Sequence, residues 1–133
     1  MQSTKSITLY GIPNCDTVKK ARVWLDEQNV DFIFHNFKKD GLDRNTIENW
    51  LANVDFDLLI NRKGTTWRAL SDQQKASCTN PEDAIALMLA SPSVIKRPVL
   101  QINSNDHTHV AVGVSAHIYQ TIFNYILYEK HSS

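Results

Sequence analysis

Residues 7–37 alternate between strand and helix patterns, and this alternation is the strongest constraint on how the chain folds. The apolar run 7–10 predicts a strand, and residues 11–14 (Gly-Ile-Pro-Asn) predict a turn. Residues 15–28 predict a helix, and residues 31–37, rich in aromatic side chains, predict a second strand. One face of the helix is apolar and carries Val18, Ala21, Trp24 and Leu25. Strand, helix and strand together predict a βαβ unit with parallel pairing.

Cys15 lies in the first turn of this predicted helix. Unpaired N–H groups and the positive end of the helix dipole stabilise a thiolate there, and the thiolate is the reactive form of cysteine. The cations Lys19 and Arg22 act in the same direction, and Asp16 opposes them. We therefore expect the pKa of Cys15 to lie below that of a free thiol. The alternative, a small buried apolar side chain without chemistry, stays open.

The rest of the chain predicts a helical middle followed by a hairpin and a last helix. In the middle we expect a loop at 38–41 and then a helix at 45–52, opened by a capping box at 45–48. An apolar run at 56–60, a polar turn at 61–64 and a short helical piece around Trp67 and Leu70 follow. The last element of the middle is a helix at 81–89, capped by Asn80, with Ala84, Leu87 and Met88 inward. We then expect strands at 94–102 and 110–112 with a turn at 104–106, and a helix capped by Ser115 with Ile118, Ile122, Tyr125 and Ile126 inward. Residues 1–133 are predicted to form a single domain with a helical insert at about 40–92.

Charge and cysteine content exclude several classes of protein. The chain has 14 basic and 14 acidic side chains, so no basic excess indicates binding to nucleic acid or to a membrane. The first five residues lack the apolar run of a secretory signal, and two distant cysteines, Cys15 and Cys78, are not a disulfide framework. His107 and His109 do not form a metal-ligand set. We expect a cytoplasmic protein without a metal.

Three sequence blocks resemble one known family. Residues 10–21 (YGIPNCDTVKKA) followed by Trp24 and Leu25, residues 61–67 (NRKGTTW) and residues 95–98 (IKRP) are similar to blocks of the ArsC family, which also contains Spx. The combination is most similar to the YffB-like branch. The resemblance implies an α/β, thioredoxin-like fold with a mixed sheet, built as βαβ, a helical insertion and ββα.

The resemblance also implies roles for matching residues. Cys15 matches the catalytic cysteine, Arg97 matches an arginine that binds an oxyanion, and Pro98 matches a cis-proline that faces the cysteine. A cis bond at that proline would aim Arg97 and the backbone of Lys96 at Cys15. Asn14 and Thr17, on either side of Cys15, join these as expected contacts of the substrate or of glutathione.

The sequence departs from the family pattern at three places. Asn61 stands where the arsenate reductases have a further arginine, with Arg62 beside it, and no arginine follows Arg97. Val18 occupies the second position of the C-x-x-C that Spx-type regulators carry. A single thiol without a partner needs an external thiol to resolve a mixed disulfide, and glutathione is the obvious candidate.

The function implied is a glutathione-dependent thiol-disulfide reductase that uses one cysteine, with glutathione as co-substrate and a thiol or oxyanion compound as substrate. The alternatives are an arsenate reductase linked to glutathione or glutaredoxin, and a non-catalytic Spx-like interaction module, for which RNA polymerase would be the partner.

Several residues keep two interpretations. Cys78 is either a resolving thiol or a loop cysteine without a role. Arg62 either binds an anion or belongs to a solvated face with Lys63 and Arg68, and Thr17 either binds the thiolate or caps helix N–H groups. The three tryptophans, Trp24, Trp50 and Trp67, are expected in the core rather than in a ligand cage.

Overall fold

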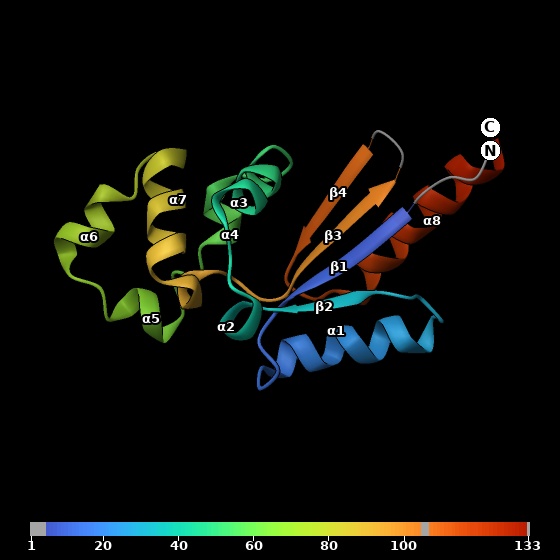
Figure 1. Cartoon of the computed structure of the whole chain (residues 1–133), viewed down its shortest axis with the longest axis horizontal. Coiled ribbons are helices and arrows are strands. Elements are labelled where there is room, and N and C mark those ends of the chain that lie inside the picture. The colour runs from blue at the N-terminus through green and yellow to red at the C-terminus, as the bar shows by residue number, and fades with distance from the viewer. Residues whose placement is uncertain (1–4, 105–106, 133) are drawn as a thin grey trace. The chain divides into compact units, whose positions relative to one another are not determined.

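The computed structural model describes residues 5–104 and 107–132, and it contains two compact units (Figure 1). The sheet unit is formed by Met1–Asn36 together with Arg97–Ser133, and the helical unit by Phe37–Lys96. The helical unit therefore begins three residues before, and ends four residues after, the predicted insert at about 40–92.

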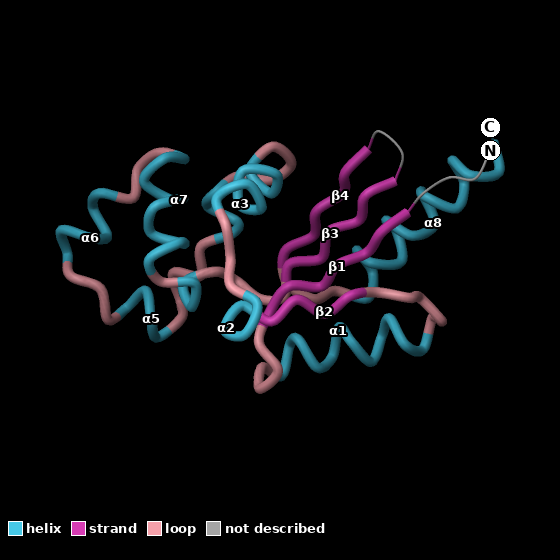
Figure 2. Tube along the Cα trace, viewed as in Figure 1, coloured by secondary structure: helices cyan, strands magenta, loops and turns pink. Residues whose placement is uncertain are grey.

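Four strands form the mixed sheet of the sheet unit, in the order β2-β1-β3-β4 (Figure 2). β1 (Lys5–Gly11) runs parallel to β2 (Ile33–Asn36), and α1 (Asp16–Glu27) joins them as the crossover. β3 (Val99–Ser104) lies antiparallel to β1, β4 (His107–Val112) lies antiparallel to β3, and α8 (Ala116–Ser132) ends the unit. This is the predicted α/β, thioredoxin-like plan.

One face of the sheet carries the core of this unit, because alternate strand residues point to the same side. Leu9 in β1 and Leu100 in β3 are opposite each other and fully buried. The cluster joins strands and both helices: Ile7, Leu9, Leu100, Ile102 and Ala111 from the strands, Val18, Ala21 and Leu25 from α1, and Tyr119 from α8. α1 and α8 thus cover the same face of the sheet.

Gly11 fixes the distance between the end of β1 and the first turn of α1. A Cβ at this position would lie 2.7 Å from Cγ2 of Val18, which is a fully buried, β-branched side chain. Because a buried valine has little freedom to move, only glycine allows this close approach. The approach brings the helix start, and Cys15 with it, to the carboxyl end of β1.

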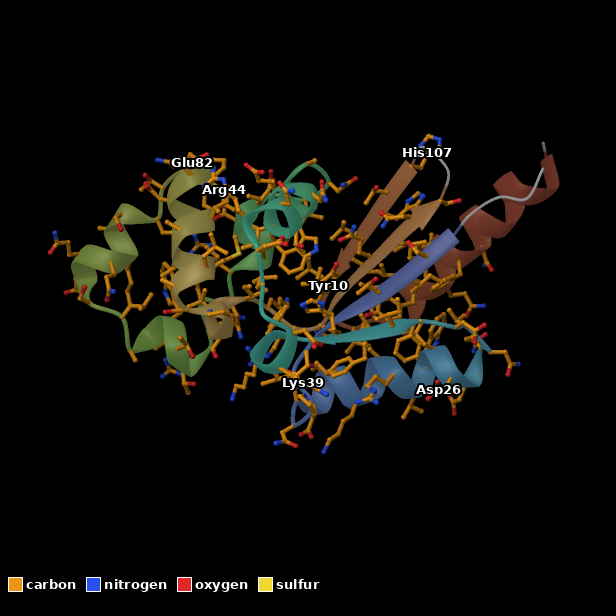
Figure 3. The ribbon with its side chains drawn as sticks, viewed as in Figure 1. Tyr10, Asp26, Lys39, Arg44, Glu82 and His107 are labelled. Atoms are coloured by element: carbon orange, nitrogen blue, oxygen red, sulfur yellow. The ribbon has the colours of Figure 1, made fainter. Side chains whose placement is uncertain are left out.

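The helical unit consists of short helices. They are α2 (Phe37–Asp40), α3 (Arg44–Leu51), α4 (Phe56–Leu59), α5 (Thr65–Arg68), α6 (Asp72–Ser77), α7 (Pro81–Ala90) and the 3₁₀ turn Pro92–Val94. Trp50 and Met88 are fully buried, and Trp67 is nearly so. Arg44 of α3 forms ion pairs with Glu48 on its own helix and with Glu82 on α7 (Figure 3).

The predicted caps are partly confirmed. Asn80 accepts a hydrogen bond from the N–H of Asp83 at the start of α7, and Ser115 accepts one from Ile118 N–H at the start of α8. The capping box predicted at 45–48 is wrong, because α3 begins earlier and Asp43 is its N-cap. The Asp43 carboxylate accepts hydrogen bonds from both N–H and hydroxyl of Thr46.

The structure also corrects two element predictions. The loop expected at 38–41 is the helix α2, which begins directly where β2 ends. The strand expected at 94–102 begins at Val99, since Ile95 and Lys96 instead pair with Ile60 and Leu59 of the helical unit, and Pro98 has no N–H to donate to a ladder.

The inward face of α8 differs from the prediction by one position. Ile118 is half exposed, whereas Tyr119 is fully buried and donates its hydroxyl to the carbonyl of Gly113. Ile122 packs against the core as predicted, and the side chains of Tyr125 and Ile126 lie outside the described residues. α6 has no predicted counterpart.

Candidate active site at the start of helix α1

Cys15 is the N-cap residue of α1, and its backbone is extended, with φ −108° and ψ 126°. Its carbonyl accepts the first helical hydrogen bond from the N–H of Lys19, while its side chain remains at the open end of the helix. The first N–H groups of a helix have no partner within the helix. Here the N–H groups of Thr17 and Val18 lower the pKa of the Cys15 thiol.

Two further groups bind the same sulfur. The Thr17 Oγ1 atom lies 3.1 Å from Cys15 Sγ, and the side chain of Arg97 also forms a hydrogen bond with the sulfur. Arg97 stands just before β3, so the chain brings together residues that are 82 positions apart. The predicted grouping of Cys15, Thr17 and Arg97 is present within the sheet unit.

The balance of these contacts favours the thiolate. Partial burial raises the pKa of the Cys15 thiol and is the largest single influence on it. The hydrogen bonds from Thr17, from Val18 N–H, from Arg97 and from Thr17 N–H together outweigh burial, so the pKa of Cys15 lies below its ordinary value. The predicted direction is confirmed. Arg97, which the resemblance places beside Cys15, is the cation that lowers the pKa of this thiol, and neither Lys19 nor Arg22 is among its causes.

The peptide bond between Arg97 and Pro98 is cis, as predicted. Thr17 donates its hydroxyl to the carbonyl of Arg97 over 3.1 Å, and the carbonyl of Pro98 accepts the N–H of Gly113. These bonds hold the segment before β3 against α1 on one side and against the end of β4 on the other. Sequence patterns did not indicate the bond between Thr17 and the Arg97 carbonyl, since it joins positions 80 residues apart.

The other predicted site residues have different surroundings. Asn14 is an exposed turn residue next to Cys15. Lys96, Asn61 and Arg62 belong to the helical unit. Lys96 N–H donates to the carbonyl of Leu59 over 2.6 Å, and the amide oxygen of Asn61 accepts the N–H of Lys63. Their proposed part in the site therefore stays a prediction.

Arg62 already has two partners within the helical unit. Its Nη2 atom lies 2.8 Å from the Asp57 carboxylate, and its guanidinium stands 5.2 Å above the ring of Trp67. Cys78 lies in the same unit, at the end of α6, and is buried rather than exposed in a loop. Both cysteines are free thiols.

Comparison with known proteins agrees with this geometry. The model of the ArsC family matches residues 10–122. The chain belongs to the ArsC family. The solved structure of a YffB protein is 44% identical, with a TM-score of 0.78, and covers 87% of this chain and 97% of its own. A solved arsenate reductase (ArsC)-related protein from Brucella melitensis is 43% identical, with a TM-score of 0.66, over 89% of this chain and 94% of its own.

A further relative is the global transcriptional regulator Spx of Streptococcus pyogenes, 30% identical over 97 residues, which are 71% of this chain and 70% of the relative. The chain is thus a YffB-like member of a family of thiol-based reductases. Among residues 5–104 and 107–132, no three His, Cys, Asp or Glu side chains are grouped so as to hold a metal ion. Within the same residues, no helix has the length and apolar character needed to span a membrane.

Proposed function

We propose that this protein is a glutathione-dependent thiol-disulfide reductase that works through the single thiolate of Cys15. The observation that carries the proposal is the setting of its sulfur: it lies at the start of α1, 3.1 Å from Thr17 Oγ1, where helix N–H groups and the Arg97 side chain lower the pKa of the thiol. Val18 occupies the position of a second cysteine in α1, so the mixed disulfide has no neighbour in that helix to resolve it.

The reaction proceeds as two exchanges. The Cys15 thiolate attacks the glutathione sulfur of a mixed disulfide, forms a Cys15–glutathione disulfide and releases the substrate thiolate. A glutathione thiolate then attacks the glutathione sulfur of that adduct, which gives oxidised glutathione and restores the Cys15 thiolate. Two electrons pass from glutathione to the substrate, and the site needs no metal for either exchange. The glutathione pool of a reducing cytosol supplies the second thiol.

Arg97 has a second role in this proposal. A guanidinium binds a carboxylate with two parallel hydrogen bonds, and glutathione carries two carboxylates. Arg97 stands beside the sulfur, so it holds glutathione while it stabilises the thiolate. The peptide backbone of glutathione lies along the residue before Pro98.

Two other functions are supported by relatives and stand as competitors. The protein from Brucella melitensis is named as related to arsenate reductase, and the Streptococcus relative is named Spx. Arsenate carries several negative charges, and Arg97 is the one arginine that matches the family's anion-binding set, which favours thiol substrates over arsenate. The absence of a second cysteine at position 18 favours an enzyme over an Spx-type switch.

The test is mass spectrometry of protein treated with oxidised glutathione. We expect one glutathione on Cys15, its removal by reduced glutathione, no adduct on that site in Cys15→Ser, and an unchanged adduct in Cys78→Ser. An adduct on Cys78 alone, or none, would contradict the proposal and favour the non-catalytic interaction module.

A further inference from the structure

A groove lies between α1 and the start of α8, within the sheet unit. Its volume is about 530 Å³, and one of its walls is formed by residues 114–116. The other wall belongs to α1 and consists of Lys19, Lys20, Val23, Trp24 and Glu27. Residues three, four and seven positions apart share one side of a helix, so the groove follows the length of α1.

Both walls of the groove begin at the candidate active site. On α1, Lys19 donates its N–H to the carbonyl of Cys15 over 2.9 Å, so the first lysine of the groove stands one helical turn from the nucleophile. On the other wall, Gly113 donates its N–H to the carbonyl of Pro98 over 2.8 Å, and Val114 follows directly. A chain whose sulfur is at Cys15 can therefore continue into the groove.

The middle of the groove is apolar. Trp24 is partly buried and packs edge-on against Tyr119, with ring centroids 5.4 Å apart. Val23 beside it is 54% exposed, and Val114 on the opposite wall is partly buried. An apolar side chain of a bound molecule would remove this surface from water, which favours binding.

The charges of the groove are divided between its ends. Lys19 and Lys20 stand at the end near Cys15, and Glu27 stands at the far end. Within the part of the chain that the structure describes, none of these three side chains forms an ion pair. From Lys20 to Glu27 the helix rises about 10 Å, which is the length of about three residues of extended chain. A segment with an acidic side chain near the nucleophile and a basic one three residues further on complements both ends.

We propose that this groove binds the protein part of a glutathionylated substrate and selects cysteines that are followed or preceded by an acidic, then an apolar and, three residues beyond the acidic one, a basic residue. The substrate class rests on the proposed reductase function, in which Cys15 takes the glutathione and the substrate leaves as a thiolate. Arg97 holds the glutathione half of the mixed disulfide in that scheme, and the groove holds the other half. An inorganic oxyanion has no chain to fill the groove.

An exchange of two charges reverses the polarity of the groove. Lys20→Glu combined with Glu27→Lys leaves the net charge of the protein unchanged. The helix dipole favours an acidic side chain nearer the start of α1 and a basic one nearer its end, so we expect the variant to fold. Lys20 is not among the groups that shift the pKa of Cys15, so the exchange does not act on the nucleophile. Glu27→Lys and Asp26→Lys form a matched pair, because both residues are exposed and only Glu27 lines the groove.

Two peptides of one composition test the polarity. The first is Lys-Ala-Leu-Glu-Cys-Glu-Leu-Ala-Lys, and the second exchanges every glutamate with a lysine. Both read the same in either chain direction, and both carry an S-methyl group that prevents disulfide exchange. With 5-fluorotryptophan in the protein, ¹⁹F spectra report on each tryptophan, and Trp24→Phe identifies the Trp24 resonance. We expect the first peptide to shift this resonance and to bind about tenfold more tightly than the second, since each exposed charge pair contributes little.

The variants decide whether the groove causes this preference. The charge exchange is expected to reverse it, Glu27→Lys to weaken it and Asp26→Lys to keep it. Equal affinity of the native chain for the two peptides would overturn the proposal, and so would a preference that the charge exchange leaves unchanged.

A kinetic measurement separates the groove from the reductase function. With glutathione in place of the S-methyl group, mass spectrometry follows the transfer of glutathione from each peptide to Cys15. We expect the first peptide to react about tenfold faster than the second with the native chain, and more slowly than the second with the charge exchange. Equal rates would overturn the role of the groove in substrate selection. Transfer from neither peptide would contradict the reductase function, while the ¹⁹F titration still decides whether the groove binds such a segment.

Discussion

Cys15 and Cys78 show how local structure gives one type of side chain two different chemistries. Cys15 is the N-cap of α1 in the sheet unit, and Cys78 is the C-cap of α6 in the helical unit. Burial raises the pKa of both thiols. At Cys15, hydrogen bonds from α1 and Arg97 reverse this effect. At Cys78, the positive charge of Arg62 lowers the pKa only in part, while Asp83 and Asp57 raise it further.

Burial alone therefore does not distinguish a reactive cysteine from an inert one. The difference lies first in the helix start at Cys15, where N–H donors and positive potential favour the thiolate. A second contribution comes from the neighbouring side chains. A hydroxyl and a guanidinium lower the pKa of Cys15, whereas at Cys78 the carboxylates of Asp83 and Asp57 oppose the guanidinium of Arg62.

The largest expected effect is on the rate of alkylation. With iodoacetamide in excess and each cysteine followed by peptide mass spectrometry, we expect Cys15 to react first, with a midpoint below the free-thiol pKa of about 8.5. Cys78 should stay unmodified until the chain is unfolded, because it is buried and its pKa is raised. A Cys15 midpoint at or above the free-thiol value would remove the contrast.

The lowered pKa of Cys15 also affects the free energy of unfolding. A pKa that is lower in the folded than in the unfolded chain stabilises the folded state at pH values above the unfolded-state pKa, and this stabilisation is lost as the pH falls through the folded-state pKa. The contribution of Cys78 to stability changes with pH in the opposite direction, because the pKa of Cys78 is raised on folding. Denaturant unfolding of Cys15→Ala and Cys78→Ala against pH separates the two contributions.

The next largest effect is expected when the Arg97 side chain is removed. We expect Arg97→Ala to weaken the binding of glutathione by about 1.5–3 kcal/mol, the cost of losing a hydrogen bond to a charged group. The pKa of Cys15 should rise in the same variant, since one donor to the sulfur is gone. Calorimetry with S-methylglutathione measures the first effect without disulfide exchange.

Arg62→Ala is the matched control for Arg97→Ala, because Arg62 is the other arginine for which the sequence leaves anion binding open. Its guanidinium is already paired with Asp57 and stacked on Trp67. We expect a smaller loss of affinity than in Arg97→Ala. A larger loss would move the main carboxylate contact to the helical unit.

Cys78→Ala tests whether the second thiol has only a packing role. Removing the sulfur of Cys78, a residue that is 7% exposed, is expected to lower the free energy of unfolding by about 1 kcal/mol, the value of one small buried apolar group. The glutathione adduct on Cys15 and its resolution should be unchanged. Loss of resolution by glutathione in Cys78→Ala would identify Cys78 as a resolving cysteine.

The contrast between the two units also explains what could be predicted from the sequence. Periodic apolar residues defined β1 and α1 because both elements bury one face, as Leu9 and Val18 do. α6 was missed because it has no buried residue, so no apolar period marks it. The prediction placed Ile118 on the inward face of α8, where the structure has Tyr119, because isoleucine and tyrosine both suit a core. Only the hydrogen bond from Tyr119 to the carbonyl of Gly113 decides between them.

The features of the candidate site also divide into those that the sequence predicts and those that it does not. Cys15 followed from its place at a helix start, and Arg97 and Pro98 from the resemblance to the ArsC family. The bond from Thr17 to the Arg97 carbonyl depends on how β3 is aligned with β1, and no local pattern encodes that alignment. Besides the helix start and Arg97, the sequence also indicated Lys19 and Arg22 as cations that favour the thiolate, because they are close to Cys15 in sequence. In the structure the guanidinium of Arg22 stands 4.6 Å from the centroid of the Phe34 ring.

The smallest expected effect concerns arsenate. The native chain should reduce it weakly or not at all, since Arg97 alone matches the family's anion-binding arginines and the carboxylate of Asp57 already pairs with Arg62. Asn61→Arg restores an arginine where the family has one and is expected to raise any trace turnover. It also removes the hydrogen bond that the Asn61 side chain accepts from Lys63 N–H, at a cost of about 0.5–1.5 kcal/mol in folding. Asn61→Asp, which keeps the acceptor without adding a positive charge, and Asn61→Leu, which removes both, separate these contributions. Coupled turnover assays with arsenate and glutathione provide the measurement, and rapid reduction by the native chain would show that Arg62 or lysine side chains replace the missing arginines.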